Sequence, residues 1–270
     1  MNPAAPPFDV RDSSMKDNKG RGAAATDPVA VLYEDNHLIV AIKPAGVLSQ
    51  ADGSGKPDML TILKQDIKVR YDKPGQVFLG LVHRLDQPVS GVMVFARTSK
   101  AAARLSEQIR EHHVAKYYLA VIHGCPDKQT GTLQDRLVKN PATGQVSLAA
   151  ADLGQTAWLD YQVIESLADK KLTLLVIRLG SGRGHQIRVQ LASRGWPIVG
   201  DHRYGRPITK DEPSEPALFA CLFGLDHPVS GQRLNFHADP PAQMPWLFFK
   251  PVETAALADY FEPHPQSSGK

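Results

Sequence analysis

The sequence HRLDQPVSG, residues 83–91, lies between the apolar segments LGLV (79–82) and VMVFA (92–96). One acidic residue, Asp86, therefore stands in a polar, turn-prone segment flanked by two segments with strand character. Arg84 and the Ser-Gly pair can orient this carboxylate and shield it from water. A carboxylate that acts as a nucleophile or a base needs such partial burial and a neighbouring cation. A surface turn with an Asp cap and an Arg salt bridge explains the same residues, so both interpretations stay open here.

Outward from this segment, short apolar or alternating runs predict a chain dominated by strands. The expected strands are 29–34, 38–42, 91–96, 117–122, 157–164, 171–179 and 217–225. The first two are expected to form a hairpin around Asp35-Asn36. Helical spacing predicts three helices, at 58–69, 99–111 with Ser99 as N-cap, and 185–194 ending before Gly195. Strands with few helices, not in strict alternation, indicate an α+β fold with a mostly antiparallel or mixed sheet.

Composition limits the classes of protein to consider. The 270 residues are 42% hydrophobic and 22% charged, which is typical of globular proteins and not of disordered or fibrous ones. A net charge of +3 permits an anionic partner without requiring one. Cys125 and Cys221 stand far apart in a chain without a signal-peptide pattern, which predicts a reducing, cytoplasmic environment. No apolar run approaches the roughly 18 residues of a membrane span, so we expect no membrane association.

Three regions are expected along the chain. Residues 1–27 mix Pro, Ala, Ser, Gly and charge without periodicity and are predicted to be a flexible arm. Residues 28–262 are predicted to form one domain, and residues 263–270 a frayed tail. The absence of a long amphipathic seam leads us to expect a monomer.

A second group of chemically versatile residues is GSGRGHQIR, residues 180–188, where a strand enters a glycine-rich turn that opens a helix. Backbone N–H groups at such a turn attract phosphate, and Arg183 and Arg188 add cations that bind it in bidentate fashion. The spacing matches neither the P-loop nor the dinucleotide-binding fingerprint, so we expect no nucleotide cofactor. A tight turn with solvated arginines is the alternative.

The third group surrounds Lys116 and Tyr118, which lie two residues apart and so share one face of the expected strand. Tyr118 can be a stacking surface for a base or a plain core aromatic. The adjacent His112 and His113 cannot both turn toward one ion, and no HExxH motif or cysteine pair completes a ligand set, so no metal is expected. Without a G-x-S-x-G motif, hydrolysis by acyl transfer has little support.

Together these segments resemble the RluA-type pseudouridine synthases over nearly the whole chain, from about Val29 to Phe261. The matching features are HRLD with Ser-Gly and a strand (83–95), a basic residue with Tyr-x-Ala and Gly (Lys116, Tyr118, Ala120, Gly124), the run Gly182 to Arg188 with Gly200-Asp201 and Tyr204-Gly205, and the opening Lys43-Pro44-Ala45-Gly46. Pro88-Val89 and Ser181 depart from the commoner residues of these motifs. Neither departure removes a side chain that the chemistry uses.

The resemblance implies a mixed, mostly antiparallel sheet in two sub-sheets, with flanking helices and a central cleft. It also implies isomerisation of uridine to pseudouridine in RNA, without a cofactor or a metal. No S4-like RNA-binding module is expected, which places the chain among relatives that rely on the catalytic domain alone. Ribosomal RNA, transfer RNA or both are the expected substrates.

The resemblance also implies roles for individual residues. Asp86 would attack C1′ or remove a proton from C2′, and Arg183 would pair with Asp86 to keep it ionised. Tyr118 would stack on the base and relay the C5 proton, while Arg84 would fill the gap left by the flipped nucleotide. The remaining substrate contacts expected are His83, Arg188, Lys43 and Lys116.

Two other classes of function share features with this sequence. A non-catalytic RNA-binding or chaperone protein could share the scaffold, but Asp86, Tyr118 and Arg183 are all present. A small-molecule hydrolase such as a nucleosidase could use Asp86, but it would need a second catalytic carboxylate that the sequence does not indicate. The enzyme acting on RNA is therefore the main prediction.

Overall fold

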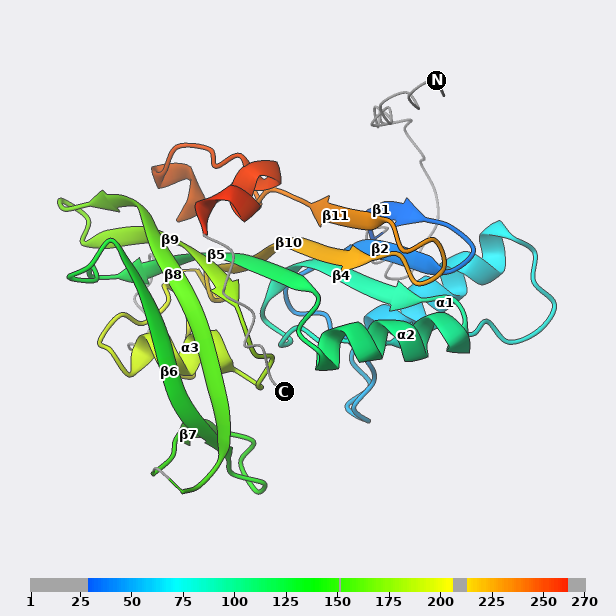
Figure 1. Cartoon of the computed structure of the whole chain (residues 1–270), viewed down its shortest axis with the longest axis horizontal. Helices are drawn as coiled ribbons and strands as arrows, with labels where there is room; N and C mark the ends of the chain where they lie inside the picture. The colour runs from blue at the N-terminus through cyan, green and yellow to red at the C-terminus, as the bar shows by residue number, and fades with distance from the viewer. Residues whose placement is uncertain (1–28, 151, 206–212, 262–270) are drawn as a thin grey trace.

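A computed structural model describes residues 29–150, 152–205 and 213–261, so the predicted arm and tail lie outside the described residues. Within this part of the chain, the structure contains one 11-stranded mixed sheet, three α-helices and two 3-10 helices (Figure 1). The predicted α+β class is confirmed. No helix among the described residues has both the length and the apolar character needed to cross a membrane.

The N-terminal half of the sheet contains the loop that carries Asp86. Its elements are β1 (Val31–Glu34), β2 (Leu38–Lys43), α1 (Met59–Arg70), β3 (Gly80–Leu81), β4 (Ser90–Ala96) and α2 (Ser99–Arg110). The second half contains β5 (Ala115–His123), β6 (Thr130–Lys139), β7 (Val146–Leu148), β8 (Gln155–Leu167), β9 (Leu172–Leu179) and α3 (Gln186–Ala192). The chain then forms β10 (Leu218–Asp226), β11 (Arg233–His237) and the 3-10 helices η1 (Trp246–Phe248) and η2 (Thr254–Tyr260).

Local signals explain most of the element boundaries. The β1–β2 turn forms as expected, because the Asp35 carboxylate accepts the N–H groups of His37 and Leu38, each at 2.7 Å. The N-cap of α2 was predicted one residue too late: Thr98, not Ser99, has extended backbone and accepts the N–H of Ala101 at 3.1 Å. The short β3 lies within the apolar segment 79–82. Strands β6, β7 and β11 were not predicted, because polar residues interrupt their apolar periodicity.

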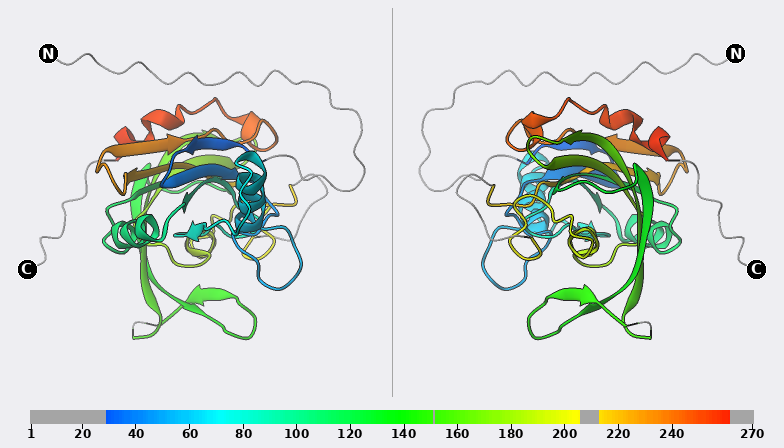
Figure 2. Two further views of the ribbon diagram at one scale, coloured as in Figure 1. Left: turned by 90° about the vertical axis from the view of Figure 1, so that its right-hand side faces the viewer. Right: turned by 90° about the vertical axis from the view of Figure 1, so that its left-hand side faces the viewer.

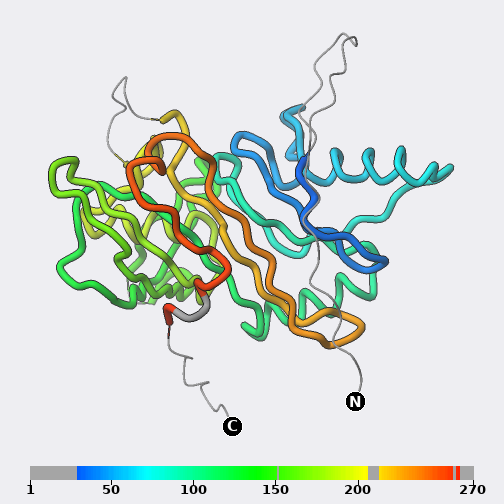
Figure 3. Tube along the Cα trace, turned by 90° about the horizontal axis from the view of Figure 1, so that it is seen from above, coloured from blue at the N-terminus to red at the C-terminus, as the bar shows by residue number. Residues whose placement is uncertain are grey.

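The strand order is β1-β2-β4-β10-β5-β9-β8-β6-β7, with β3 on β4 and β11 on β10. Strand β10 comes late in the chain yet lies between β4 and β5, as the orange tube between the blue and green halves shows (Figure 3). The two predicted sub-sheets are thus joined into one sheet. Strands β6 and β8 extend beyond the rest of the sheet as a long projection that carries β7 near its tip (Figure 2). From here on, "the arm" means this projection and not residues 1–27.

The join between the two halves is only two residue pairs wide. Strand β10 pairs in parallel with β4 at Phe219–Ser90 and Ala220–Gly91, and the other strand pairs of the described sheet are antiparallel. Gly91 has φ +131°, and a Cβ there would overlap the backbone of Ala220. The glycine of the Ser-Gly pair is therefore required for this close approach.

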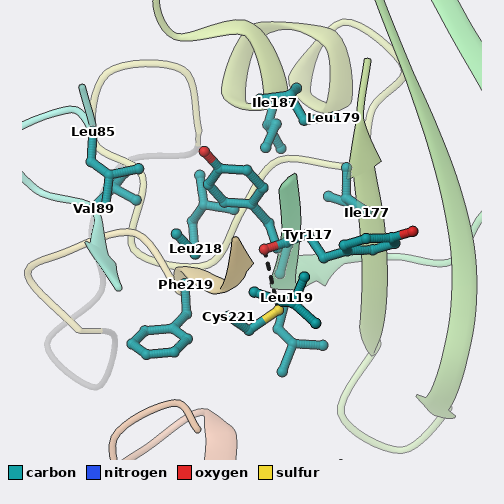
Figure 4. Packing of buried hydrophobic residues seen from close by; sticks show 14 of the residues in the cluster. Leu85, Val89, Tyr117, Leu119, Ile177, Leu179, Ile187, Leu218, Phe219 and Cys221 are labelled. Atoms are coloured by element: carbon teal, nitrogen blue, oxygen red, sulfur yellow. Dashed lines mark hydrogen bonds between the residues drawn. The ribbon is translucent and has the colours of Figure 1, made fainter. Parts of the chain in front are cut away.

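The main core lies beneath this join. Leu85 and Val89, which lie on either side of Asp86, pack in the same cluster as Ile187 of α3 and Leu218 of β10 (Figure 4). Burial of these side chains holds the Asp86 loop against both halves of the sheet. The loop and the start of α3 therefore meet over β5 and β10.

We expect Gly91→Ala to destabilise the protein by about 3 kcal/mol or more, because both the overlap with Ala220 and the left-handed φ oppose a side chain. Urea denaturation followed by circular dichroism measures the change. Gly75→Ala is the matched control, since Gly75 is exposed with open space around it, and we expect its effect to stay within about 0.5 kcal/mol. Equal stabilities for the two variants would contradict the packing role of Gly91.

Candidate active site

Lys43 supports the Asp86 loop from inside the protein. Its side chain is fully buried, and Nζ donates to the carbonyls of Pro44 (2.9 Å), Val47 (2.5 Å) and Gln87 (2.8 Å). Burial lowers the pKa of Lys43 to about 7, although the nearby Asp86 opposes this shift. The placement contradicts the predicted phosphate contact, because no part of Lys43 reaches the surface.

Ser49 holds the same loop from the other side. Its hydroxyl donates to the Leu85 carbonyl (2.8 Å) and accepts the Leu85 N–H (3.1 Å). Gly46 and Gln87 bind each other through two further hydrogen bonds, Gly46 N–H to the Gln87 carbonyl and the Gln87 amide to the Gly46 carbonyl. The Lys43–Gly46 motif thus serves to fix the loop that carries Asp86.

Asp86 forms its ion pair with Arg188, which lies in the first turn of α3. Arg188 Nη1 is 3.1 Å from Asp86 Oδ2, and the same guanidinium binds Asp201 in bidentate fashion, with Nε to Oδ2 at 2.7 Å and Nη2 to Oδ1 at 2.8 Å. Although burial acts in the other direction, Arg188 holds the pKa of Asp201 below its ordinary value. The Asp201 side chain is 1% exposed and the Asp86 side chain 23%, so only Asp86 can reach a ligand.

The predicted pairing of Arg183 with Asp86 is wrong. Arg183 lies in the exposed turn before α3, and its Nε donates to the Thr156 carbonyl at 3.1 Å. Side chains on a helix lean toward its N-terminus, and Arg188 therefore extends toward the Asp86 loop. Because Arg188 is buried between two carboxylates, its predicted role as a phosphate contact is contradicted as well.

The glycine-rich turn is organised by Gln186. Its Oε1 accepts the Arg183 N–H (3.1 Å) and the Ser181 hydroxyl (2.9 Å), while its Nε2 donates to the Trp158 carbonyl (2.9 Å). The Arg183 N–H, which the predicted phosphate site would have used, therefore already donates to the Gln186 side chain. Arg183 keeps its exposed guanidinium beside the cavity.

Tyr118 and Lys116 project from β5 into the cavity, as their spacing of two predicts. Tyr118 is buried, and burial together with the nearby charge of Asp86 raises the pKa of its phenol. The phenol is therefore protonated at neutral pH. Burial lowers the pKa of Lys116 to about 8, with the positive charge of Arg183 adding to the shift.

His83 has a structural role in place of the predicted RNA contact. Its Nε2 accepts the N–H of Val94 at 3.0 Å, in the part of β4 between the residues paired with β10 and those paired with β3. Its ring packs on Phe223 with the centroids 4.5 Å apart. Burial lowers the pKa of His83 to about 3, so the ring is neutral. The next residue, Arg84, is exposed and lines the cavity.

The cavity has a volume of about 760 Å³, and Asp86 is one of the residues that line it. Volumes of this size accommodate small organic ligands. Four basic side chains line the cavity without forming an ion pair with any acidic side chain among the described residues: Arg84, Lys116, Lys139 and Arg183. The cavity therefore places positive charge around Asp86, whose carboxylate is both partly exposed and paired with an arginine.

Several residues of the site were missed. Lys139 comes from the arm at the end of β6, an element that was not predicted. Asp201 and His185 stood in the quoted motifs without an assigned role. In the part of the chain that is described, no group of three His, Cys, Asp or Glu residues could hold a metal ion.

Comparisons with known proteins found a matching family and similar sequences. Residues 37–193 match the family described as RNA pseudouridylate synthase. The ribosomal large subunit pseudouridine synthase D of Zymomonas mobilis is 33% identical over 231 residues, which are 82% of this chain and 72% of that protein. Its counterpart in Nitrosomonas europaea is 34% identical over 242 residues, 86% of this chain and 68% of that protein.

The fold has a solved counterpart. The structure of human RNA pseudouridylate synthase domain containing 4 superimposes with a TM-score of 0.66 at 23% identity, covering 79% of this chain and 89% of that one. At this identity the likeness concerns the fold alone, and it agrees with the mixed sheet described above.

We expect Lys43→Met to lower the free energy of unfolding by at least about 1–3 kcal/mol, the cost of leaving a buried carbonyl without a donor. The salt dependence of RNA binding should stay that of the wild type, because Lys43 does not reach the surface. Denaturation and filter binding at several salt concentrations measure the two quantities. The control Lys68→Met changes an exposed lysine of α1. A reduced salt slope for a folded Lys43→Met protein would restore the predicted phosphate contact.

Proposed function

This chain belongs to the RluA-type RNA pseudouridine synthases, and from that premise we propose that it converts specific uridines of ribosomal RNA, transfer RNA or both to pseudouridine by means of Asp86. The observation that carries the proposal is the Asp86 carboxylate, partly exposed in a basic cavity and paired with a buried arginine. The names of the bacterial relatives favour large-subunit ribosomal RNA as the first substrate to test.

The reaction rearranges one nucleotide without adding or removing atoms. The bond from uracil N1 to C1′ breaks, the base turns, a bond from C5 to C1′ forms, and the C5 proton is replaced by a proton on N1. Asp86 either attacks C1′ to give an ester or removes the C2′ proton to give a glycal. Both routes need an ionised carboxylate with a free oxygen, and Arg188 contacts Oδ2 while Oδ1 forms no hydrogen bond among the described residues.

The target base must leave its stack before its glycosidic bond can be reached, which costs a few kcal/mol. We propose that Tyr118 stacks on the flipped uracil and that Arg84 fills the space the nucleotide leaves, which offsets part of this cost. The raised pKa of Tyr118 suits stacking and hydrogen-bond donation. A relay of the C5 proton through Tyr118 would require its hydroxyl to give up one proton as it accepts another.

Binding of the RNA backbone is assigned to Lys116, Lys139 and Arg183, together with Arg84 at the edge of the cavity. Each phosphate that a cation neutralises releases a counterion, so affinity should fall steeply with salt. This holds despite the modest net charge of +3, because the relevant charges are gathered around one cavity. Action in the cytoplasm stays a prediction.

We expect Asp86→Asn to lower turnover by at least about 10²-fold while RNA affinity stays close to that of the wild type. The amide keeps the shape of the side chain but cannot supply a negative oxygen. Release of tritium from RNA labelled at uridine C5 measures turnover on unmodified large-subunit ribosomal RNA and transfer RNA. Filter binding measures affinity.

The matched control for this experiment is Asp52→Asn. Asp52 also lines the cavity, but it is exposed, and its carboxylate accepts the N–H of the nearby Ser54. Its variant should turn over RNA at the wild-type rate. If Asp86→Asn matched that control, Asp86 would not be the reacting carboxylate; if neither variant nor wild type acted on any RNA, the proposed substrates would be wrong.

Two arginine variants separate positioning from RNA binding. Arg183→Gln should reduce the slope of log affinity against log salt by about one with little effect on turnover of bound RNA. Arg188→Lys should lower turnover by 10-fold or more, because an ammonium cannot replace the guanidinium that spans Asp86 and Asp201. Single-turnover rates at saturating enzyme and binding at several salt concentrations measure both effects. If Arg183→Gln instead lowered turnover and Arg188→Lys instead reduced the salt slope, Arg183 would be the partner of Asp86.

A further inference from the structure

His185 faces the oxygen of Asp86 that Arg188 leaves free. Its Nε2 is 3.9 Å from Asp86 Oδ1, and its Nδ1 is 2.6 Å from the hydroxyl oxygen of Tyr204. The residue has φ +54°, a left-handed conformation that costs a residue with a Cβ about 1–2 kcal/mol. Glycine would adopt this backbone without strain. Strained residues of this kind are common at functional sites, so the imidazole between Asp86 and Tyr204 is a candidate for a functional role.

The hydrogen bonds around the ring indicate which nitrogen carries the proton. The Tyr204 hydroxyl oxygen accepts the N–H of Val146, the first residue of β7, at 3.0 Å. The phenol proton is then free to be donated to His185 Nδ1, which accepts it. The imidazole proton must in that case be on Nε2, which faces the negative charge of Asp86. Both neighbours of the ring favour the same tautomer.

Burial keeps the His185 ring neutral. Burial lowers the pKa of His185, and the positive charges of Arg188 and Arg203 act in the same direction, while Asp86 and Asp201 oppose them. In a neutral imidazole one nitrogen donates a hydrogen bond and the other accepts one. In this tautomer Nδ1 of His185 accepts from Tyr204, and Nε2 can donate to Asp86.

We propose that His185 is a positioning residue for Asp86, donating its Nε2–H to Oδ1 in the complex with RNA while Arg188 holds Oδ2. The distance of 3.9 Å is longer than a hydrogen bond, and such contacts commonly shorten once substrate is bound. Each carboxylate oxygen has two lone pairs, so Oδ1 keeps one for the sugar. The proposal rests on the proposed function, and it adds that the β7 end of the arm sets the tautomer through Tyr204.

Two variants separate the Nε2 donor from the strained backbone. Gln places its amide near the position of Nε2, whereas Asn places its amide near the position of Nδ1. Asn is also the residue that tolerates a left-handed backbone best after glycine. If the backbone were all that matters, His185→Asn would be the better enzyme. If the donor to Asp86 matters, His185→Gln will be the better one.

We expect His185→Asn to lower kcat on RNA by about 10-fold to 10²-fold with little change in KM, and His185→Gln to retain most of the rate, since small misplacements of a reacting group have effects of this size. Tritium release from C5-labelled RNA measures both. An Asn variant as fast as or faster than the Gln variant would overturn the role of Nε2.

A direct measurement uses the free protein without RNA. The ¹⁵N chemical shifts of the His185 ring, assigned by comparison with His185→Asn, should show the Nε2–H tautomer. Tyr204→Phe keeps the ring that packs on Arg188 but removes the phenol proton, so the tautomer should become mixed and kcat should fall. Tyr260→Phe, at an exposed tyrosine of η2, is the matched control.

The two experiments fail independently. An Nδ1–H tautomer in the wild type would overturn the inference even if the enzyme is fully active. Full turnover by Asp86→Asn would overturn the proposed function and leave the tautomer unaffected. The expected pair of results is an Nε2–H ring together with an enzyme that requires Asp86.

Discussion

One guanidinium shared between two carboxylates is the interaction on which the site depends. Arg188 joins the exposed carboxylate of Asp86 to the buried carboxylate of Asp201. Taking an ion pair out of water is costly, and it is tolerated only when the hydrogen bonds are nearly complete. Asp201 meets this condition by also accepting the N–H groups of Arg203 and Tyr204. The bidentate pair orients Arg188, and Arg188 in turn orients Asp86.

The sequence predicted the parts of the structure that depend on local signals. The α+β class, the first hairpin, all three α-helices and seven strands were expected within a few residues of their observed bounds. Asp86 and Tyr118 were expected at the site, and the structure brings both to one cavity. Each depends on a short motif beside an apolar strand, and such motifs can be recognised without knowledge of the tertiary structure.

The rest depends on contacts that no local pattern contains. Arg183 and Arg188 are equivalent as basic residues of one motif, and only the start of α3 decides which of them reaches Asp86 across 102 positions of the chain. The sequence alone predicts that Lys43 is a surface cation, because its three carbonyl acceptors can be seen only in the folded protein. Lys139 belongs to β6, a strand that mixes polar and apolar residues on both faces.

The position of β10 affects how the protein folds during its synthesis. This strand is formed by residues 218–226, yet it separates β4 from β5, which are made about a hundred residues earlier. On a ribosome, the chain must wait for β10 before the Asp86 loop and β5 can be held in register. Closing contacts this far apart in sequence is also the slow part of folding. A growing chain therefore has no assembled cavity until most of its sequence, β10 included, has been made.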